Sequence, residues 1–203
     1  MALAERTADT AIAQEDILRA DLYDVLGALL AHPPSRDVLT RVAALTGDAS
    51  PLGQGITALA TMANHLRPEA VETEFNQLFV GLTRGELLPY GSYYLTGFLH
   101  EKPLAALRND MRRLGIERAP NVYEPEDNIA SLCEMMAGLI RGAFGAGSGA
   151  NTERDFYNAH IAPWAGHFFT DLEGAKASVF YAPVGAIGRT FMEIEREAFR
   201  MGA

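Results

Sequence analysis

Three acidic side chains close together are the groups in this chain best placed to take part in chemistry. Glu124, Glu126 and Asp127 fall in one short stretch that is interrupted by a single proline. Carboxylates this close can act as an acid/base pair, or can receive a cationic ligand through charge-assisted hydrogen bonds. Acids at the start of a helix also stabilise the helix dipole, and on residue types alone this is the more frequent role.

The other reactive side chains do not form a recognisable catalytic or metal-binding set. His160 and His167 are separated by roughly 10 Å along a helix, which is too far for both to hold one ion. Ser92 lacks the glycine pattern of a hydrolase nucleophile, and the single cysteine, Cys133, has no basic neighbour on its helix to activate the thiol. We therefore expect no catalytic residue, no metal ligand and no bound cofactor.

The composition is that of a folded, acidic protein. Of 203 residues, 48% are hydrophobic and 21% are charged, and 26 acids against 17 bases give a net charge of -9. This charge argues against nucleic acid and favours a cationic partner. One cysteine cannot form an internal disulfide, and no apolar run reaches the length of a membrane span. These features predict a cytoplasmic protein without stable membrane insertion.

The acidic stretch opens a segment with helical periodicity. Pro125 suits the first helical position, where its missing N–H costs nothing. We therefore predict a helix over 124–141 whose acidic first turn is either a well-capped end or the edge of a pocket. Behind that turn, apolar residues recur at the spacing of one helix face, which predicts a core-facing side. These residues are Ile129, Leu132, Met136, Leu139 and Ile140.

The same periodicity recurs along nearly the whole chain, and no alternating strand pattern interrupts it. We expect a loose tail over 1–15 and a single all-α domain, a compact helical bundle, over 16–203. Ser35 is predicted to cap one helix and Gly81 to end another. The glycine-rich segment 142–150 is predicted to be a hinge before the C-terminal helices.

Two regions depart from a simple series of helices. Residues 81–97 mix glycine, proline and aromatic residues without a sustained period, which predicts an ordered loop. Its tyrosines either pack in the core or line a binding surface. Further on, the sequence predicts one helix that is capped by Asn151 or Thr152 and kinked at Pro163, a second over 172–182, and a long last helix after Pro183.

Several blocks of residues resemble those of a known protein family. The family has an aromatic-x-x-Leu-Phe-x-Gly block followed by a proline-then-Ser-x-Tyr segment, then a Glu-Pro-x-Asp-His block, and later a His-x-x-Pro-Trp block. The similar stretches here are Phe75-Asn76-Gln77-Leu78-Phe79-Val80-Gly81, Leu88-Pro89-Tyr90-Gly91-Ser92-Tyr93-Tyr94, Glu124-Pro125-Glu126-Asp127-Asn128 and His160-Ile161-Ala162-Pro163-Trp164. In order and spacing they resemble the TorD/DmsD-type chaperones of molybdenum-cofactor enzymes, also called redox enzyme maturation proteins.

The resemblance implies an all-helical chaperone rather than an enzyme. Its partners would be the twin-arginine leader and the catalytic subunit of an apo molybdoenzyme, or of its tungsten counterpart, held until the cofactor is inserted. The C-terminal half is most similar to members associated with formate dehydrogenase, which makes that enzyme the expected client. Family members form dimers by exchanging helices, so either a monomer or a domain-swapped homodimer is expected, with 142–150 as the exchange hinge.

The resemblance also implies which residues bind the leader. Phe75, Leu78 and Phe79 match the aromatic, leucine and phenylalanine of the first block, and Asp127 matches the aspartate of the acidic block. Asn128 stands where many members have histidine, so hydrogen-bonding capacity is kept while a titratable group is lost. The acids would receive the arginines, and the aromatic loop would supply apolar walls. The full expected peptide-binding set is Phe75, Leu78, Phe79, Tyr93, Glu124, Asp127 and Asn128.

Two other functions remain open from the sequence. A helical enzyme, or a small-ligand or metal-binding protein, would use the acidic start of the 124–141 helix as its site, and would show a bound metal or a turnover. A subunit or regulator would dock on its partner through the aromatic loop, and its binding would not depend on a leader.

Overall fold

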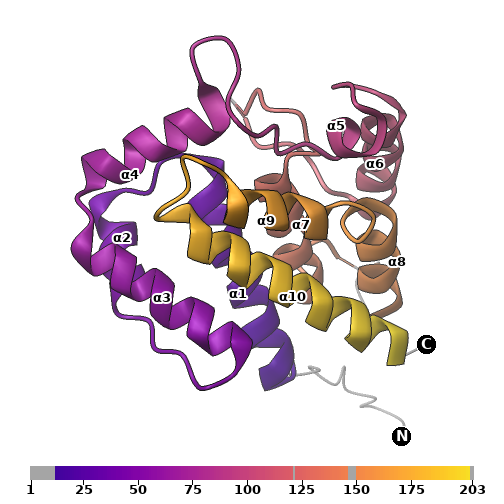
Figure 1. Ribbon diagram of the computed structural model, residues 1–203. Coiled ribbons are helices and arrows are strands. Elements are labelled where there is room, and N and C mark those ends of the chain that lie inside the picture. Colours follow the sequence, from indigo (N-terminus) through magenta and orange to yellow (C-terminus); the bar gives the residue numbers. More distant parts are fainter. Residues whose placement is uncertain (1–11, 121, 146–149, 202–203) are drawn as a thin grey trace, which may run out of the picture.

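The computed structural model describes residues 12–120, 122–145 and 150–201, and within these ranges the fold is all-α (Figure 1). The predicted fold class is confirmed. The helices are α1 (Gln14–Ala31), α2 (Arg36–Ala43), α3 (Pro51–His65), α4 (Pro68–Phe75), the π-helical turn η1 (Asn76–Val80), α5 (Gly91–Thr96), α6 (Lys102–Leu114), α7 (Ile129–Ile140), α8 (Ala150–His160), α9 (Ala165–Gly174) and α10 (Tyr181–Met201). None of these helices is long and apolar enough to cross a bilayer.

The core lies between two pairs of closely packed helices, α1 with α7 and α9 with α10. Figure 1 shows α2, α3 and α4 on one flank of these pairs and α5, α6 and α8 on the other. Helix α7 was predicted to bury one face, but its small residues are buried as well as its large ones, so it is a central helix enclosed on most sides. The largest fully buried side chains of the core include Tyr23, Tyr157, Trp164, Phe168, Phe169, Phe180 and Tyr181.

Local signals set most helix ends. The Ser35 hydroxyl accepts a hydrogen bond from the Val38 N–H at 3.3 Å, as predicted for an N-cap. Gly81 ends η1 with φ 63° and Gly115 ends α6 with φ 71°, a backbone conformation that favours glycine. Helix α1 ends just before the paired prolines, since the residue preceding proline is pushed out of the helical region.

The helices of the C-terminal third differ from the prediction. The expected single kinked helix is two helices, α8 and α9, separated at the turn that holds Pro163. The predicted helix over 172–182 is wrong, because residues 175–180 form a connection and α10 begins at Tyr181, ahead of Pro183. The cause is a distant side chain. The carboxylate of Glu74 accepts hydrogen bonds from the N–H groups of Val179, Phe180 and Tyr181, at 2.7, 3.0 and 2.8 Å, and so caps α10 from α4.

The remaining predictions concern the loop over 81–97, the N-terminal tail, the single domain and the hinge. The segment 81–97, expected to be a loop, contains the short helix α5. Of the expected tail, residues 1–11 lie outside the described ranges, and α1 starts slightly earlier than position 16. Of the expected hinge, residues 146–149 also lie outside them, while Gly142 and Gly145 have positive φ of 68° and 86°. The single domain and the hinge therefore stay predictions.

Candidate functional site

The acidic stretch that was expected to begin a helix is a turn instead, in which the Asn128 N–H donates to the Pro125 carbonyl at 3.1 Å. Helix α7 starts at Ile129, and Asn128 is its N-cap, with Oδ1 accepting a hydrogen bond from the Ala130 N–H at 2.9 Å. The prediction that Pro125 occupies the first helical position is wrong. At the end of this turn the chain pairs with another part of the protein, where Tyr90 and Asn128 form an isolated antiparallel bridge.

This pairing turns Asp127 into a cap for a different helix. The Asp127 Oδ2 atom accepts a hydrogen bond from the Ser92 N–H at 2.7 Å, and the Asp127 carbonyl accepts one from the Gly91 N–H at 2.9 Å. Both donors belong to the first turn of α5, where N–H groups have no partner within the helix. The acid therefore stabilises α5 rather than its own helix.

One oxygen of the Asp127 carboxylate has no hydrogen-bond partner. The residue is only 3% exposed, and within the described part of the chain its Oδ1 atom is buried without a donor, as is the Oγ atom of Ser92. Buried polar atoms are nearly always paired, because an unpaired one loses its hydration without compensation. An unpaired carboxylate oxygen is the costlier case, because it carries part of a charge, and a hydrogen-bond donor beside it would relieve that cost.

A small pocket adjoins this carboxylate. It has a volume of about 40 Å³ and is lined by Asp127, His160 and Trp164 together with residues of α5 and α6. One water needs roughly 10–15 Å³ of such space, so the pocket can hold several waters or a small planar cation. The His160 ring is held in place because its Nε2 lies 2.8 Å from Asp110 Oδ2. The backbone carbonyl of His160 accepts a hydrogen bond from the Trp164 Nε1–H at 2.7 Å.

The pocket brings together three blocks that are separate in the sequence. Asp127 comes from the acidic block, and His160 and Trp164 come from the His-x-x-Pro-Trp block. Gly91, from the Ser-x-Tyr segment, packs on the indole so closely that a Cβ there would lie 3.0 Å from Trp164 Nε1. A side chain at position 91 would therefore push the two blocks apart.

The two glutamates of the stretch have different surroundings. Glu126 forms ion pairs with Arg108 at 2.8 Å and Arg118 at 3.0 Å. Burial acts to raise the pKa of Glu126, but the hydrogen bonds and charges of these arginines outweigh it and lower the pKa. Glu124 is exposed, and its carboxylate accepts a hydrogen bond from the Tyr90 hydroxyl. Glu126 is thus neutralised by neighbours, whereas Glu124 faces solvent without a cationic side-chain partner in the described ranges.

A second, larger cavity of about 160 Å³ lies on the Glu124 side of the segment. Glu117, Glu124 and Glu134 supply carboxylates to its wall, and Met135 and Phe144 are among its apolar residues. Burial, and then the charge of Asp24, raise the pKa of Glu134. Over the ranges that the structure describes, no ion pair joins Glu117 or Glu134 to a base. Arg118 also lines the cavity and pairs with Glu126, so four carboxylates against one guanidinium leave an excess of negative charge beside apolar surface.

The first block lies apart from Asp127 and is largely core. Phe75 and Leu78 are 7% and 0% exposed, and Phe79 is half-buried, with its ring 4.9 Å from that of Phe75 and 5.5 Å from that of Tyr181. The block also supports the loop before α5, since the Leu78 carbonyl accepts a hydrogen bond from the Leu87 N–H at 2.8 Å. These residues position the loop rather than line an open surface.

Of the expected peptide-binding set, Tyr93 and Glu124 are the most accessible. Tyr93 is half-buried on α5, and the Arg84 guanidinium lies over its ring at 5.0 Å from the centroid. Asp127 and Asn128 are buried, the first beside the small pocket and the second as a helix cap. Sequence reasoning missed His160 as a pocket residue, and it missed the partnership of Ser92 with Asp127. The type and order of the blocks were the available signal, but no periodicity links positions so far apart.

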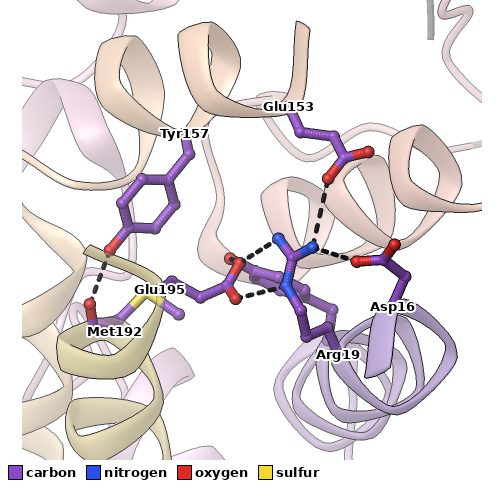
Figure 2. Close-up of polar contacts among 7 residues, drawn as sticks. Asp16, Arg19, Glu153, Tyr157, Met192 and Glu195 are labelled. Atoms are coloured by element: carbon purple, nitrogen blue, oxygen red, sulfur yellow. Dashed lines mark hydrogen bonds and ion pairs between the residues drawn. The ribbon is translucent and has the colours of Figure 1, made fainter. Parts of the chain in front are cut away.

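A different cluster of buried charge joins α1, α8 and α10 (Figure 2). Arg19 binds Glu195 in a two-pronged arrangement, with Nε–Oε1 at 2.7 Å and Nη2–Oε2 at 2.9 Å. Its Nη1 atom also contacts Asp16 at 2.7 Å and Glu153 at 3.4 Å, and the Tyr23 hydroxyl donates to Glu195 at 3.1 Å. Every buried polar side-chain atom of these five residues has a partner in the described structure, so the cluster is complete without a ligand.

The described residues contain no group of three or more His, Cys, Asp or Glu side chains arranged to hold a metal ion. Cys133 is free and buried, and burial raises the pKa of its thiol well above the usual range. A thiol in that state is a poor nucleophile at neutral pH. Nothing in this part of the chain supports the reading of the acidic stretch as a metal or catalytic centre.

Comparison with known proteins points in one direction. The profile of the nitrate reductase delta subunit family matches residues 46–170. The chaperone protein TorD of Aliivibrio salmonicida is 25% identical over 198 residues, which cover 87% of this chain and 92% of that protein. The Tat proofreading chaperone DmsD of Salmonella paratyphi A is 29% identical over 174 residues, which cover 81% and 82%.

A solved structure agrees with these sequence relatives. A crystal structure from Archaeoglobus fulgidus, described as that of a redox enzyme maturation protein, superposes with a TM-score of 0.59 at 23% identity. The match covers 87% of this chain and 94% of that one. At this identity the likeness concerns the fold, and it agrees with the all-α architecture described above.

Proposed function

This chain belongs to the nitrate reductase delta subunit family, and we propose that it is a chaperone that binds the twin-arginine leader of an apo molybdenum- or tungsten-dependent oxidoreductase. The relatives that it matches over most of its length are named chaperones, not enzymes, and one of them is named for proofreading in twin-arginine (Tat) export. The chain would hold the precursor until its cofactor has been inserted.

The observation that carries the proposal is the unpartnered Oδ1 atom of Asp127, a residue that lines the small pocket. A guanidinium presents planar N–H donors and a permanent positive charge, which are what a buried carboxylate oxygen lacks here. The pocket, with a volume of about 40 Å³, has room for one guanidinium group but not for a larger group. One arginine of the leader is therefore the expected occupant.

The cavity beside Glu124 supports a second contact. Its carboxylates, Glu117, Glu124 and Glu134, face an apolar wall that includes Met135 and Phe144. A twin-arginine leader offers cationic groups followed by an apolar segment, so acids next to apolar surface are the complementary arrangement. The overall charge of -9 acts in the same sense, because it favours encounter with a cationic peptide.

The expected peptide-binding residues divide by exposure into two roles. We propose that Glu124 and Tyr93 touch the leader directly and that Asp127 touches it through the pocket. Phe75, Leu78, Phe79 and Asn128 act indirectly: the first three pack beneath the loop that leads to α5, and Asn128 caps α7. Truncating these four residues would therefore change folding as well as binding.

Binding of a synthetic leader peptide, measured by calorimetry, tests the proposal. The variant Asp127→Asn keeps an oxygen that can accept the Ser92 hydrogen bond but removes the charge. Its dissociation constant should rise at least about ten-fold, as expected when a hydrogen bond to a charged group is lost. Asp37→Asn, at an exposed position in the first turn of α2, is the matched control and should bind like the unaltered chain.

The peptide itself supplies the complementary control. A leader in which both arginines are replaced by glutamine should lose binding to the unaltered chain, and it should no longer distinguish Asp127→Asn from that chain. Equal binding of the two peptides, or unchanged affinity of Asp127→Asn at normal thermal stability, would refute a guanidinium site at Asp127.

We propose the catalytic subunit of a formate dehydrogenase as the client, from the resemblance of the C-terminal half, noted in the sequence analysis, to family members associated with that enzyme. Capture of the precursor with and without its leader tests this choice, since the chaperone should retain only the precursor that carries the leader. Equal retention of both forms would favour docking by a leader-independent subunit or regulator.

A further inference from the structure

A cavity of about 200 Å³ opens beside α9 and α10, and shares no lining residue with the two cavities near Asp127. Its polar lining consists of Tyr157, His167, Thr170, Arg189, Glu193 and Arg196. In a chain whose acids outnumber its bases 26 to 17, two arginines against one glutamate in the lining of a cavity are a local reversal of charge. Such a reversal favours an anion.

The two arginines differ in how far they are already engaged. Arg189 pairs with Glu173 at 2.9 Å and more loosely with Glu193 at 3.6 Å. Arg196 is exposed and, within the described ranges, is joined to no acid by an ion pair. Its guanidinium is therefore free to donate to a ligand, while Arg189 holds Glu193 at the same wall.

Two groups in the cavity wall can only accept hydrogen bonds, and this limits which anions can bind there. The Thr170 hydroxyl donates to the Gly166 carbonyl at 2.9 Å, so only its lone pairs remain available, and ionised Glu193 can only accept. An anion that fits must accept from the arginines and also donate one hydrogen bond. Monohydrogen phosphate does both, whereas sulfate has no proton and would be repelled by Glu193.

We propose that this cavity is a binding site for monohydrogen phosphate, formed by Arg196 and Arg189 as donors and Glu193 as the acceptor of the phosphate proton. The cavity of about 200 Å³ has room for this ion. It is smaller than the pockets of about 300–1,000 Å³ that are typical for larger organic ligands. Tyr157 also lines the cavity, but its hydroxyl does not offer a proton to the ligand, because it already donates a hydrogen bond to the Met192 carbonyl at 2.8 Å.

Calorimetric titration of the whole chain with inorganic phosphate, at constant ionic strength, tests the site. Arg196→Ala should weaken phosphate binding by at least about ten-fold, the effect of one lost charge-assisted hydrogen bond. Arg200→Ala is the matched control: it removes the same charge from α10, but Arg200 pairs with Glu197 at 2.8 Å and does not line the cavity. It should change the affinity by less than about two-fold.

A titration with sulfate tests the role of Glu193. The unaltered chain should prefer phosphate, and Glu193→Gln should reduce that preference, because an amide can donate a hydrogen bond to sulfate. Thermal unfolding of each variant checks that the fold is intact, and Arg196→Lys keeps the charge should the alanine variant misfold. Equal weakening by the Arg196 and Arg200 variants, or equal affinity of the unaltered chain for the two ions, would overturn the proposal, as would the absence of phosphate binding.

Discussion

The cluster around Arg19 and the junction around Asp127 both bury charge where segments distant in sequence meet, yet only the first is complete. In the Arg19 cluster the guanidinium is shared by carboxylates from three helices, and Glu195 is 0% exposed (Figure 2). At the junction, Asp127 satisfies the start of α5 with one oxygen and leaves the other without a donor.

The difference suggests that the Arg19 cluster serves the stability of the fold and that the Asp127 junction serves the binding of a ligand. A buried charge whose partners all come from the chain adds to the specificity of the fold, and removing a partner leaves an uncompensated ion. A buried charge with one empty position carries a cost that a ligand can relieve. Changes in the first cluster should therefore affect unfolding, and changes at the junction should affect binding.

The largest effect is expected from Arg19→Ala. This change leaves Glu195 buried without its cation and should lower the free energy of unfolding by about 3–5 kcal/mol. Chemical denaturation measures the loss, and Arg200→Ala, at an exposed position of α10, should stay within about 0.5 kcal/mol of the unaltered chain. A loss below about 1 kcal/mol for Arg19→Ala would remove the contrast between the two regions.

The next prediction sharpens the same contrast at the other site. Asp127→Asn should weaken leader binding as proposed above while changing the free energy of unfolding by no more than about 1 kcal/mol, because the amide oxygen still accepts the Ser92 hydrogen bond and no buried ion is left unpaired. Denaturation in the absence of peptide measures this. Destabilisation comparable to that of Arg19→Ala would mean that Asp127, like Glu195, serves mainly to stabilise the fold.

A smaller effect is expected from Glu124, which is exposed at the cavity beside the acidic stretch. Glu124→Gln removes an exposed charge, so leader affinity should fall only a few-fold, or by about 0.2–1 kcal/mol. The loss should shrink as salt is added, because exposed charges are screened. Glu72→Gln, which is exposed on α4, serves as the control. A loss that does not depend on salt would place Glu124 in a desolvated contact instead.

The smallest effect concerns the pH dependence of stability. The pKa of Glu126 is lowered from its usual value of 4.5, so its ion pairs contribute above that value and are lost as pH falls through the lower pKa of the folded state. Glu126→Gln should remove at most about 1 kcal/mol of this acid sensitivity, since both arginines are partly exposed. Thermal unfolding between neutral and acidic pH measures it, and parallel curves for the two proteins would contradict it.

Much of the fold could be predicted from local pattern. The helical class follows from apolar spacing, and the helix ends at Ser35, Gly81 and Gly115 follow from residues that act on their own backbone. Each of these signals needs only a few consecutive residues, so one sequence contains all the information. The order of the blocks likewise identified the family without any contact being known.

The predictions that failed at the start of α10 and at α5 share one physical cause. Glu74 caps α10 from α4, and Glu86 holds the connection before it through the N–H groups of Lys176 and Ala177, at 2.7 and 3.1 Å. These carboxylates lie about ninety residues or more from their donors, so no local pattern could place the start of α10. The same holds for α5, which was expected to be a loop and is capped by Asp127.

The candidate site shows the same division. The sequence by itself determined that acids, aromatics and a His-x-x-Pro-Trp block are present, and in what order. Only the tertiary structure decided that the acidic stretch is a turn, that Asp127 caps α5, and that Asp127 and His160 line one pocket. The physical reason is that a hydrogen bond depends on positions in space, and here the chain folds back 35 residues to bring Asp127 to Ser92.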